Sequence, residues 1–500
     1  MNLDPRLFVF AGILVAAVVV QALLPSAPAL QPNPRTTGWH TSRVVGSPEP
    51  PPPYSVQLAF PNLRFETPIE VLYDNPSDTY VVAQQDGKVL AFANQREIEQ
   101  SWLLLDVKAE EDWLENLWGV ALHPRLEQMP YLYAYYGGGE KLRLSRFRIN
   151  LNGDRPATQD EQVLLEFTTY GHMGGALIFG PDEYLYLGIG DGTGASDGFR
   201  TGQDISDLYA SVVRLDVNNT GSKPYSIPPD NPFLNHPDAQ PEVWAYGVRQ
   251  VWKMSYDSES GHIYGGDVGQ DLWEALYRFE AGGNYGWSVN ESGHPFQTNR
   301  KRGPTPILSP LVSHPHYEMR SITAGHVYRG TRLPELNARF IYGGYDSGTI
   351  WGVDTEPGSA PQLLADTSLR ISCFGRNDRS GEVLAVDHAS GRLFEIVPNT
   401  KQTNPADFPH LLSETGLFES VKDQVPADGV ISIDVNSPLW SDGAVKKRFM
   451  AIPGDKQIDF EKITYLALDE PGWRGWQFPD GTVLVKTFYL DVQTDDGIQR

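Results

Sequence analysis

The sequence predicts an all-β protein, a six-bladed β-propeller followed by a second, incomplete all-β module. The 500 residues combine 12 Trp, 23 Tyr and 21 Phe with 48 Gly and 39 Pro, a balance typical of many short strands joined by turns. Between residues 57 and 398 an apolar run, a turn of Gly, Asp or Ser and a second apolar run recur six times. Propeller blades bury their faces against one another, so this repetition predicts blades.

The six units are spaced irregularly along the chain. They occupy residues 79–92, 118–136, 170–197, 243–268, 323–353 and 371–397. In the first unit, Asp86 and Gly87 separate the two apolar runs, as expected for a hairpin turn. A β-sandwich is the alternative, but a single sandwich rarely needs about 340 residues. We therefore expect six blades.

The chain divides into four predicted segments. They are a signal peptide or membrane anchor (1–30), a Pro-rich linker (31–56), the six-bladed propeller (57–398) and a C-terminal β-rich module (399–500). The first assignment rests on an uncharged run from Leu7 to Leu24, which is long for a signal-peptide core and marginal for a membrane span. The last module stops after a polar stretch, and we expect it to be truncated. These features predict an exported protein, periplasmic or extracellular.

The charge balance excludes two classes of partner. Sixty-three acidic and 40 basic residues give a formal net charge of −23, which disfavours binding to nucleic acid and to anionic membrane surfaces. Membrane contact is then expected only through an N-terminal anchor. Cys373 is the single cysteine, so the chain forms no internal disulfide, and we expect this thiol to be buried and inert.

The hairpin at 170–197 carries the most chemistry. His172, flanked by small residues, enters its first strand, and Asp191 lies where its second strand ends, in a glycine-rich loop. Small flanking residues allow close approach of a ligand to the backbone. An imidazole beside a carboxylate is the minimum needed for a general base. A structural histidine and an aspartate that only caps a turn are the alternatives.

Nine short runs appear in order within the predicted propeller. They are WGVALHP (118–124), GHMGG (171–175), GPD (180–182), GDG (190–192), GQD (202–204), YGVR (246–249), GDVGQ (266–270), GNYGW (283–287) and VYRG (327–330). Together they resemble the glucose/sorbosone dehydrogenase family of six-bladed propellers. Enzymes of that family use pyrroloquinoline quinone (PQQ) held by calcium above the propeller axis.

The resemblance implies catalytic roles for three residues. His172 matches the general base that takes the proton of the sugar's anomeric hydroxyl while hydride passes to the quinone. Asp191 matches the carboxylate that orients this imidazole. Arg249 matches a cation that neutralises charge developing on the quinone oxygen.

The resemblance also implies a binding site for the cofactors. Gln203 and Arg249 match cofactor contacts, and Arg329 matches a cation facing a cofactor carboxylate. The backbone carbonyls of Val268 and Gly269 match calcium ligands. We therefore expect the predicted side chains to converge at one end of the propeller axis.

Two functions follow from the resemblance. The first is an exported quinoprotein that oxidises the anomeric carbon of aldose sugars and passes electrons to an acceptor. The C-terminal module resembles segments that in some bacterial proteins lead into c-type cytochrome domains, and this resemblance implies a c-type cytochrome as that acceptor. The alternative is a non-catalytic propeller that binds a glycan or a protein, since hedgehog-interacting relatives share the runs at 266–270 and 283–287. A weaker third reading is a propeller hydrolase acting on lactones through a calcium ion.

Overall fold

A computed structural model describes most of the chain. The described residues are 38–46, 51–110, 113–149, 160–218, 223–400, 408–441, 443–460, 476–479, 481–494 and 497–499. The predicted signal peptide or anchor (1–30) lies outside them. Among the described residues, no helix combines the length and the apolar character that a membrane crossing requires.

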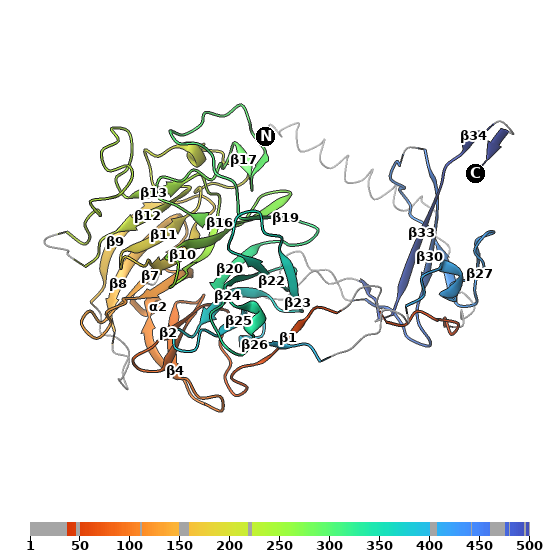
Figure 1. The fold of residues 1–500 in the computed structure, drawn as a ribbon, viewed down its shortest axis with the longest axis horizontal. Coiled ribbons are helices and arrows are strands. Elements are labelled where there is room, and N and C mark those ends of the chain that lie inside the picture. Colours follow the sequence, from red (N-terminus) through yellow and green to blue (C-terminus); the bar gives the residue numbers. More distant parts are fainter. Residues whose placement is uncertain are drawn as a thin grey trace, which may run out of the picture. The chain divides into compact units, whose positions relative to one another are not determined.

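Six four-stranded antiparallel sheets follow one another along residues 51–401 (Figure 1). The first three are β2 (Pro68–Asp74), β3 (Thr79–Gln84), β4 (Lys88–Ala93) and β5 (Trp102–Asp106); β6 (Asn116–Leu122), β7 (Tyr131–Gly138), β8 (Lys141–Arg148) and β9 (Gln162–Thr168); and β10 (Gly174–Phe179), β11 (Leu185–Ile189), β12 (Ser211–Leu215) and β13 (Val243–Tyr246). The other three are β14 (Val251–Tyr256), β15 (Ile263–Asp267), β16 (Trp273–Phe279) and β19 (Val312–Pro315); β20 (Ile322–Val327), β21 (Arg339–Gly344), β22 (Thr349–Asp354) and β23 (Gln362–Asp366); and β24 (Ile371–Arg376), β25 (Val383–Asp387), β26 (Arg392–Pro398) and β1 (Tyr54–Leu58). The short elements between them are α2 (Val107–Glu110), η1 (Thr201–Gln203), η2 (Pro334–Leu336), β17 (Asn290–Glu291) and β18 (His294–Pro295).

The six sheets are arranged in a ring. The first strand of each sheet packs against the first strand of the next, and β24 packs against β2. The hydroxyl of Ser372 in β24 donates to the carbonyl of Pro68 in β2, at 2.6 Å. β1 precedes the first sheet in sequence but pairs with β26, so the sixth sheet contains strands from both ends of the propeller. The predicted all-β fold with six propeller blades is confirmed.

Two predicted boundaries are corrected. The unit predicted at 243–268 joins strands of two sheets, because β13 completes the third sheet and the fourth begins with β14. The apolar run at 243–246 is indistinguishable in sequence from the start of a blade. The predicted linker 31–56 is also too long, since its last residues belong to β1 and its middle belongs to the second unit.

Every first strand has a β-bulge at the same level. The bulged residues are Ile69, Trp118, Gly175, Lys253, Gly325 and Ser372. A bulge re-aims side chains and backbone locally, and here it does so around the ring axis. We call the end of the ring at which the first strands begin the entry end, and the opposite end the exit end.

An ion pair fills the centre of the ring at this level. The ammonium of Lys253 in the fourth sheet lies 2.9 Å from Glu70 Oε2 in the first sheet and 3.1 Å from the carbonyl of Trp118 in the second. Both charged residues are buried. Burial raises the pKa of the Glu70 carboxyl, and the charge of Lys253 opposes that shift. The indole of Trp252 crosses to the carbonyl of Ser372 in the sixth sheet, at 2.8 Å. Side chains therefore separate the two ends of the axis.

The second unit combines residues from both ends of the chain. Its three-stranded sheet consists of β29 (Val430–Ile433), β30 (Val445–Ala451) and β33 (Val483–Tyr489). Short elements complete it: η4 (Leu412–Glu414), β27 (Phe418–Ser420), β28 (Val425–Pro426), β31 (Asp459–Phe460), β32 (Trp476–Gln477), β34 (Val492–Thr494) and β35 (Gly497–Gln499). Trp39, from the predicted linker, is buried in its core, and its indole donates to the carbonyl of Gly416 at 2.9 Å. The module is β-rich, as expected, but it is not purely C-terminal.

Replacing Lys253 by Met leaves the Glu70 carboxylate buried without its cation. Breaking a buried ion pair in this way costs about 3–5 kcal/mol, so we expect Lys253→Met to lose that much free energy of unfolding in a urea titration at pH 7. The double variant Glu70→Gln/Lys253→Met should recover much of the loss. As a control, Arg339→Met breaks the exposed pair with Asp354 and should cost less than about 1 kcal/mol. Wild-type stability of Lys253→Met would contradict the assignment.

Candidate functional site

His172 and Asp191 form a hydrogen-bonded pair at the entry end. His172 lies two residues before the start of β10 and Asp191 two residues after the end of β11, two strands that pair with each other. Nδ1 of the imidazole lies 2.7 Å from Asp191 Oδ1. A carboxylate only accepts hydrogen bonds, so Nδ1 is the donor in this bond, and in the neutral form of the imidazole the lone pair is then on Nε2. The His172 side chain is 21% exposed, whereas that of Asp191 is fully buried.

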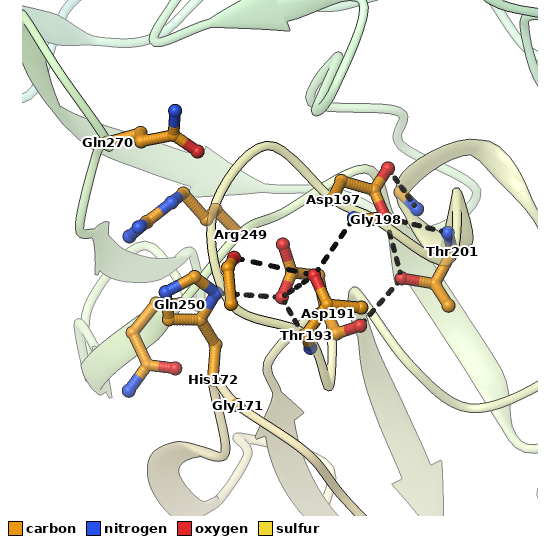
Figure 2. A network of polar contacts seen from close by, with 12 residues as sticks. Gly171, His172, Asp191, Thr193, Asp197, Gly198, Thr201, Arg249, Gln250 and Gln270 are labelled. Carbon is orange, nitrogen blue, oxygen red and sulfur yellow. Dashed lines mark hydrogen bonds and ion pairs between the residues drawn. The ribbon is translucent and has the colours of Figure 1, made fainter. Parts of the chain in front are cut away.

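The buried carboxylate of Asp191 is satisfied by groups from two sheets. Oδ1 also accepts from the backbone N–H of Thr193 at 3.0 Å, and Oδ2 accepts from the indole N–H of Trp287 at 2.9 Å. Trp287 lies in the fourth sheet's long insertion between β16 and β19. The hydroxyl of Thr201 donates to the backbone carbonyl of Asp191 at 2.8 Å. Figure 2 shows His172, Thr193 and Thr201 gathered around Asp191. A buried charge with several donors has one fixed orientation.

Arg249 joins the pair from the fourth sheet. It lies two residues before the start of β14, and its backbone carbonyl accepts from the Asp191 N–H at 2.9 Å. Its guanidinium lies 5.6 Å from the centre of the Trp287 ring, so one indole contacts both the carboxylate and the cation. Arg249 is buried, and its Nε has no hydrogen-bond partner among the described residues. His172, a potential base, and Arg249, a cation with one N–H group unpaired among the described residues, therefore lie at the same end of the ring (Figure 2).

Buried carboxylates compensate the charge of Arg249. Burial lowers the pKa of its guanidinium, while Asp191, Asp267, Glu274 and Glu291 act in the opposite direction. Asp267 accepts the backbone N–H of Arg249 at 3.0 Å, and burial raises the pKa of this carboxyl to about 7. The negative surroundings favour a protonated guanidinium at this position.

Arg329, predicted to face a cofactor carboxylate, lies at the exit end. It follows the end of β20, as Asp257 follows the end of β14. Its Nε and Nη2 donate to the two carboxylate oxygens of Asp257 at 2.9 and 2.7 Å, and Nη1 lies 2.8 Å from Glu259. The prediction is therefore wrong. Sequence order within a blade does not reveal which end of a strand a residue occupies.

Gln203 lies near the site, but its amide is engaged within the protein. Its Nε2 donates to Asn284 Oδ1 at 2.9 Å and to the carbonyl of Trp287 at 2.8 Å. Its Oε1 accepts from the side chain of Asn284 and the N–H of Gly303, both at 3.0 Å. These bonds hold the Trp287 backbone in place. The structure therefore supports a positioning role for Gln203 and gives no support for a cofactor contact.

Of the two predicted calcium ligands, the carbonyl of Val268 is already engaged within the protein. The carbonyl of Val268 accepts from Nη1 of Arg249 at 2.9 Å, so a calcium ion at this oxygen would lie against a guanidinium. Gly269 lies in the same turn, and its N–H donates to Glu274 Oε2 at 3.2 Å. Within the described part of the chain, no cluster of three or more His, Cys, Asp or Glu side chains has the geometry of a metal site.

Sequence reasoning missed two residues that organise the site. The first is Trp287, since nothing in its local sequence indicates a bond to Asp191, 96 residues away. Arg300 was not singled out; its Nη1 lies 3.0 Å from Oδ2 of the buried Asp197, which fixes the loop after Asp191. The only local signal for Arg300 is its place in a long insertion, where functional residues gather.

Comparisons with known proteins agree with this fold. The chain is 32% identical over 283 residues to the HIPL1 protein of Arabidopsis thaliana, covering 52% of this chain and 40% of that protein. It is 32% identical over 156 residues to the hedgehog-interacting protein of Mus musculus, covering 28% and 22%. The chain thus spans at most about two fifths of the length of either relative.

A solved structure and a family profile cover the propeller. The PQQ-bound aldose sugar dehydrogenase from Streptomyces coelicolor matches with a TM-score of 0.53 at 19% identity, over 70% of this chain and 99% of that one. At this identity the match shows the fold alone. The profile of the glucose/sorbosone dehydrogenase family matches residues 65–395, most of the propeller. The chain belongs to the glucose/sorbosone dehydrogenase family.

Proposed function

We propose that this protein is a quinoprotein oxidoreductase that oxidises the anomeric carbon of aldose sugars. One observation carries the proposal: the imidazole of His172, with Nε2 free and Nδ1 bonded to a buried carboxylate, shares the entry end with the buried cation of Arg249. Oxidation of an alcohol by hydride transfer needs a hydride acceptor, and a base that takes the proton and a cation that stabilises charge on the acceptor both assist the step. Membership of the family and the PQQ-bound Streptomyces structure support PQQ as the cofactor.

The residues present fit a quinone better than a calcium ion. The unpartnered Nε of Arg249 can donate to an anionic or carbonyl oxygen. PQQ would supply an electrophilic carbonyl group that accepts the hydride. Since the Val268 carbonyl is engaged by Arg249, calcium takes no part in the steps described below.

His172 is assigned the role of general base. Its Nε2 accepts the proton of the anomeric hydroxyl as the C–H bond breaks. Asp191 then stabilises the imidazolium through the 2.7 Å bond to Nδ1, and the donors from Thr193 and Trp287 keep that carboxylate in place. Arg249 supplies positive charge where negative charge develops on the acceptor. Because these groups are already oriented, little reorganisation accompanies the reaction.

We further propose that the protein is exported and passes its electrons to a c-type cytochrome. The N-terminal apolar run from Leu7 to Leu24 supports export. The second unit carries basic side chains on one sheet, among them Lys446, Arg448 and Lys486, in a chain of net charge −23. Such charges can guide the approach of an acidic partner.

The function is tested by titrating the purified protein with PQQ, with and without calcium, and then following aldose-dependent dye reduction. We expect binding at micromolar concentration. The His172→Ala variant should bind PQQ but lose about 10²- to 10⁴-fold in kcat, the range for loss of a general base. Absence of PQQ binding would overturn the proposal. Full activity of His172→Ala in a PQQ-binding protein would overturn only the assignment of the base.

A second prediction concerns Trp287. In Trp287→Phe, the buried carboxylate of Asp191 loses one donor, and a hydrogen bond to a charged group is worth about 1.5–3 kcal/mol. We expect kcat/KM to fall about ten-fold or more. Trp102→Phe is the matched control, since its indole N–H has no partner among the described residues; this variant should keep wild-type kcat/KM. Equal activities of the two variants would contradict the role of Trp287.

The second candidate function is binding of a glycan or protein without catalysis. The similarity to the plant HIPL1 protein and to the mouse hedgehog-interacting protein favours it. The two candidates differ in whether the protein binds a quinone, since a non-catalytic propeller requires none. The PQQ titration measures this difference directly.

A further inference from the structure

Two aromatic side chains stand exposed next to His172. Tyr170 is 60% exposed and Phe199 is 63% exposed. Their ring centroids are 5.7 Å apart and their planes meet at 84°, so the pair forms an angled apolar surface. We call Tyr170 and Phe199 the aromatic corner. Neither residue contributes to the steps assigned to His172 and Arg249.

The aromatic corner is tied to the catalytic pair by the backbone. Tyr170 N–H donates to the carbonyl of Gly192 at 2.9 Å, and Gly192 N–H donates to the carbonyl of His172 at 3.1 Å. His172 N–H in turn donates to the carbonyl of Thr193 at 2.8 Å. Two residues of chain span at most about 7 Å, so the Cα atoms of Tyr170 and His172 lie within that distance of each other.

The loop that presents Phe199 is firmly anchored. Arg300 donates to the carbonyl of Ser196 at 2.9 Å and to the carbonyl and carboxylate of Asp197, each at 3.0 Å. Asp197 is buried and also accepts the N–H of Thr201 at 2.8 Å, as Figure 2 shows. Ser196, Asp197 and Arg200 adopt positive φ angles, which persist only where surrounding contacts enforce them. The exposed ring is therefore held in a defined place.

We propose that the aromatic corner binds the second ring of an oligosaccharide whose reducing-end ring is at His172. This assignment rests on the proposed function and narrows its substrate class to sugars of two or more units. The C–H faces of a pyranose are apolar and carry slight positive charge, so they pack against the negative face of an aromatic ring. An angled apolar surface beside the base suits this second ring, and exposed apolar patches commonly mark binding sites.

The experiment compares glucose with the disaccharides maltose and cellobiose. In the PQQ-loaded enzyme, the ratio of kcat/KM for the preferred disaccharide to that for glucose should exceed one. In Tyr170→Ala/Phe199→Ala this ratio should fall about ten-fold, chiefly through KM of the disaccharide. Tyr170→Phe/Phe199→Tyr keeps both rings and should restore the ratio. Phe488→Ala removes a ring that is 52% exposed in the second unit and should leave the ratio unchanged.

Calorimetric titration of the cofactor-free protein with the same disaccharides gives a readout that needs no turnover. Weaker disaccharide binding in Tyr170→Ala/Phe199→Ala supports the aromatic corner, even if the protein binds no PQQ and the proposed oxidoreductase function fails. Conversely, an enzyme that oxidises glucose with PQQ but binds the disaccharides equally well in wild type and double variant retains the proposed function and overturns the aromatic corner. A wild-type ratio of one or less also overturns it.

Discussion

The buried carboxylate of Asp191 is the constraint on which the candidate site depends. A charge removed from water must find several hydrogen-bond donors, and here the donors come from His172, the Thr193 backbone and Trp287. These groups belong to two adjacent sheets. Satisfying one carboxylate therefore fixes the base, the loop that follows it and the long insertion of the fourth sheet. Mobility in any of them would leave the charge partly unsatisfied.

The ring supplies the rigidity that this arrangement requires. Each first strand has neighbours on both sides, and the bulges at one level allow Lys253, Glu70 and Trp252 to fill the axis. A filled axis divides the propeller into two chemically separate ends. The entry end collects His172, Asp191 and Arg249, whereas the exit end collects Arg329 and Asp257 in a closed ion pair. At the entry end, Nε of Arg249 has no hydrogen-bond partner among the described residues.

The sequence could predict the features that depend on interactions between neighbouring residues, but not those that depend on contacts between residues far apart in the chain. The strand–turn–strand repeats and the His172–Asp191 hairpin are local, so alternation and turn residues were sufficient to find them. Whether a residue lies at the entry or the exit end depends on strand direction within the assembled ring. For this reason Arg329 was assigned to the wrong end from the sequence alone. The bond from Trp287 to Asp191 and the amide bonds of Gln203 to Asn284 span 96 and 81 residues. A single sequence carries no signal for such pairings.

The sixth sheet and the second unit share a topological property. The sixth sheet joins β1 to β26, and the second unit joins Trp39 to Gly416 across 377 residues. The propeller is therefore an insertion within the second unit, and its two ends meet where Asn399 N–H donates to the carbonyl of Pro53 at 2.9 Å. On the ribosome, Trp39 emerges long before its partners exist, so the second unit cannot form until the whole propeller has been made. The second unit can therefore fold completely only after the whole propeller has been synthesised.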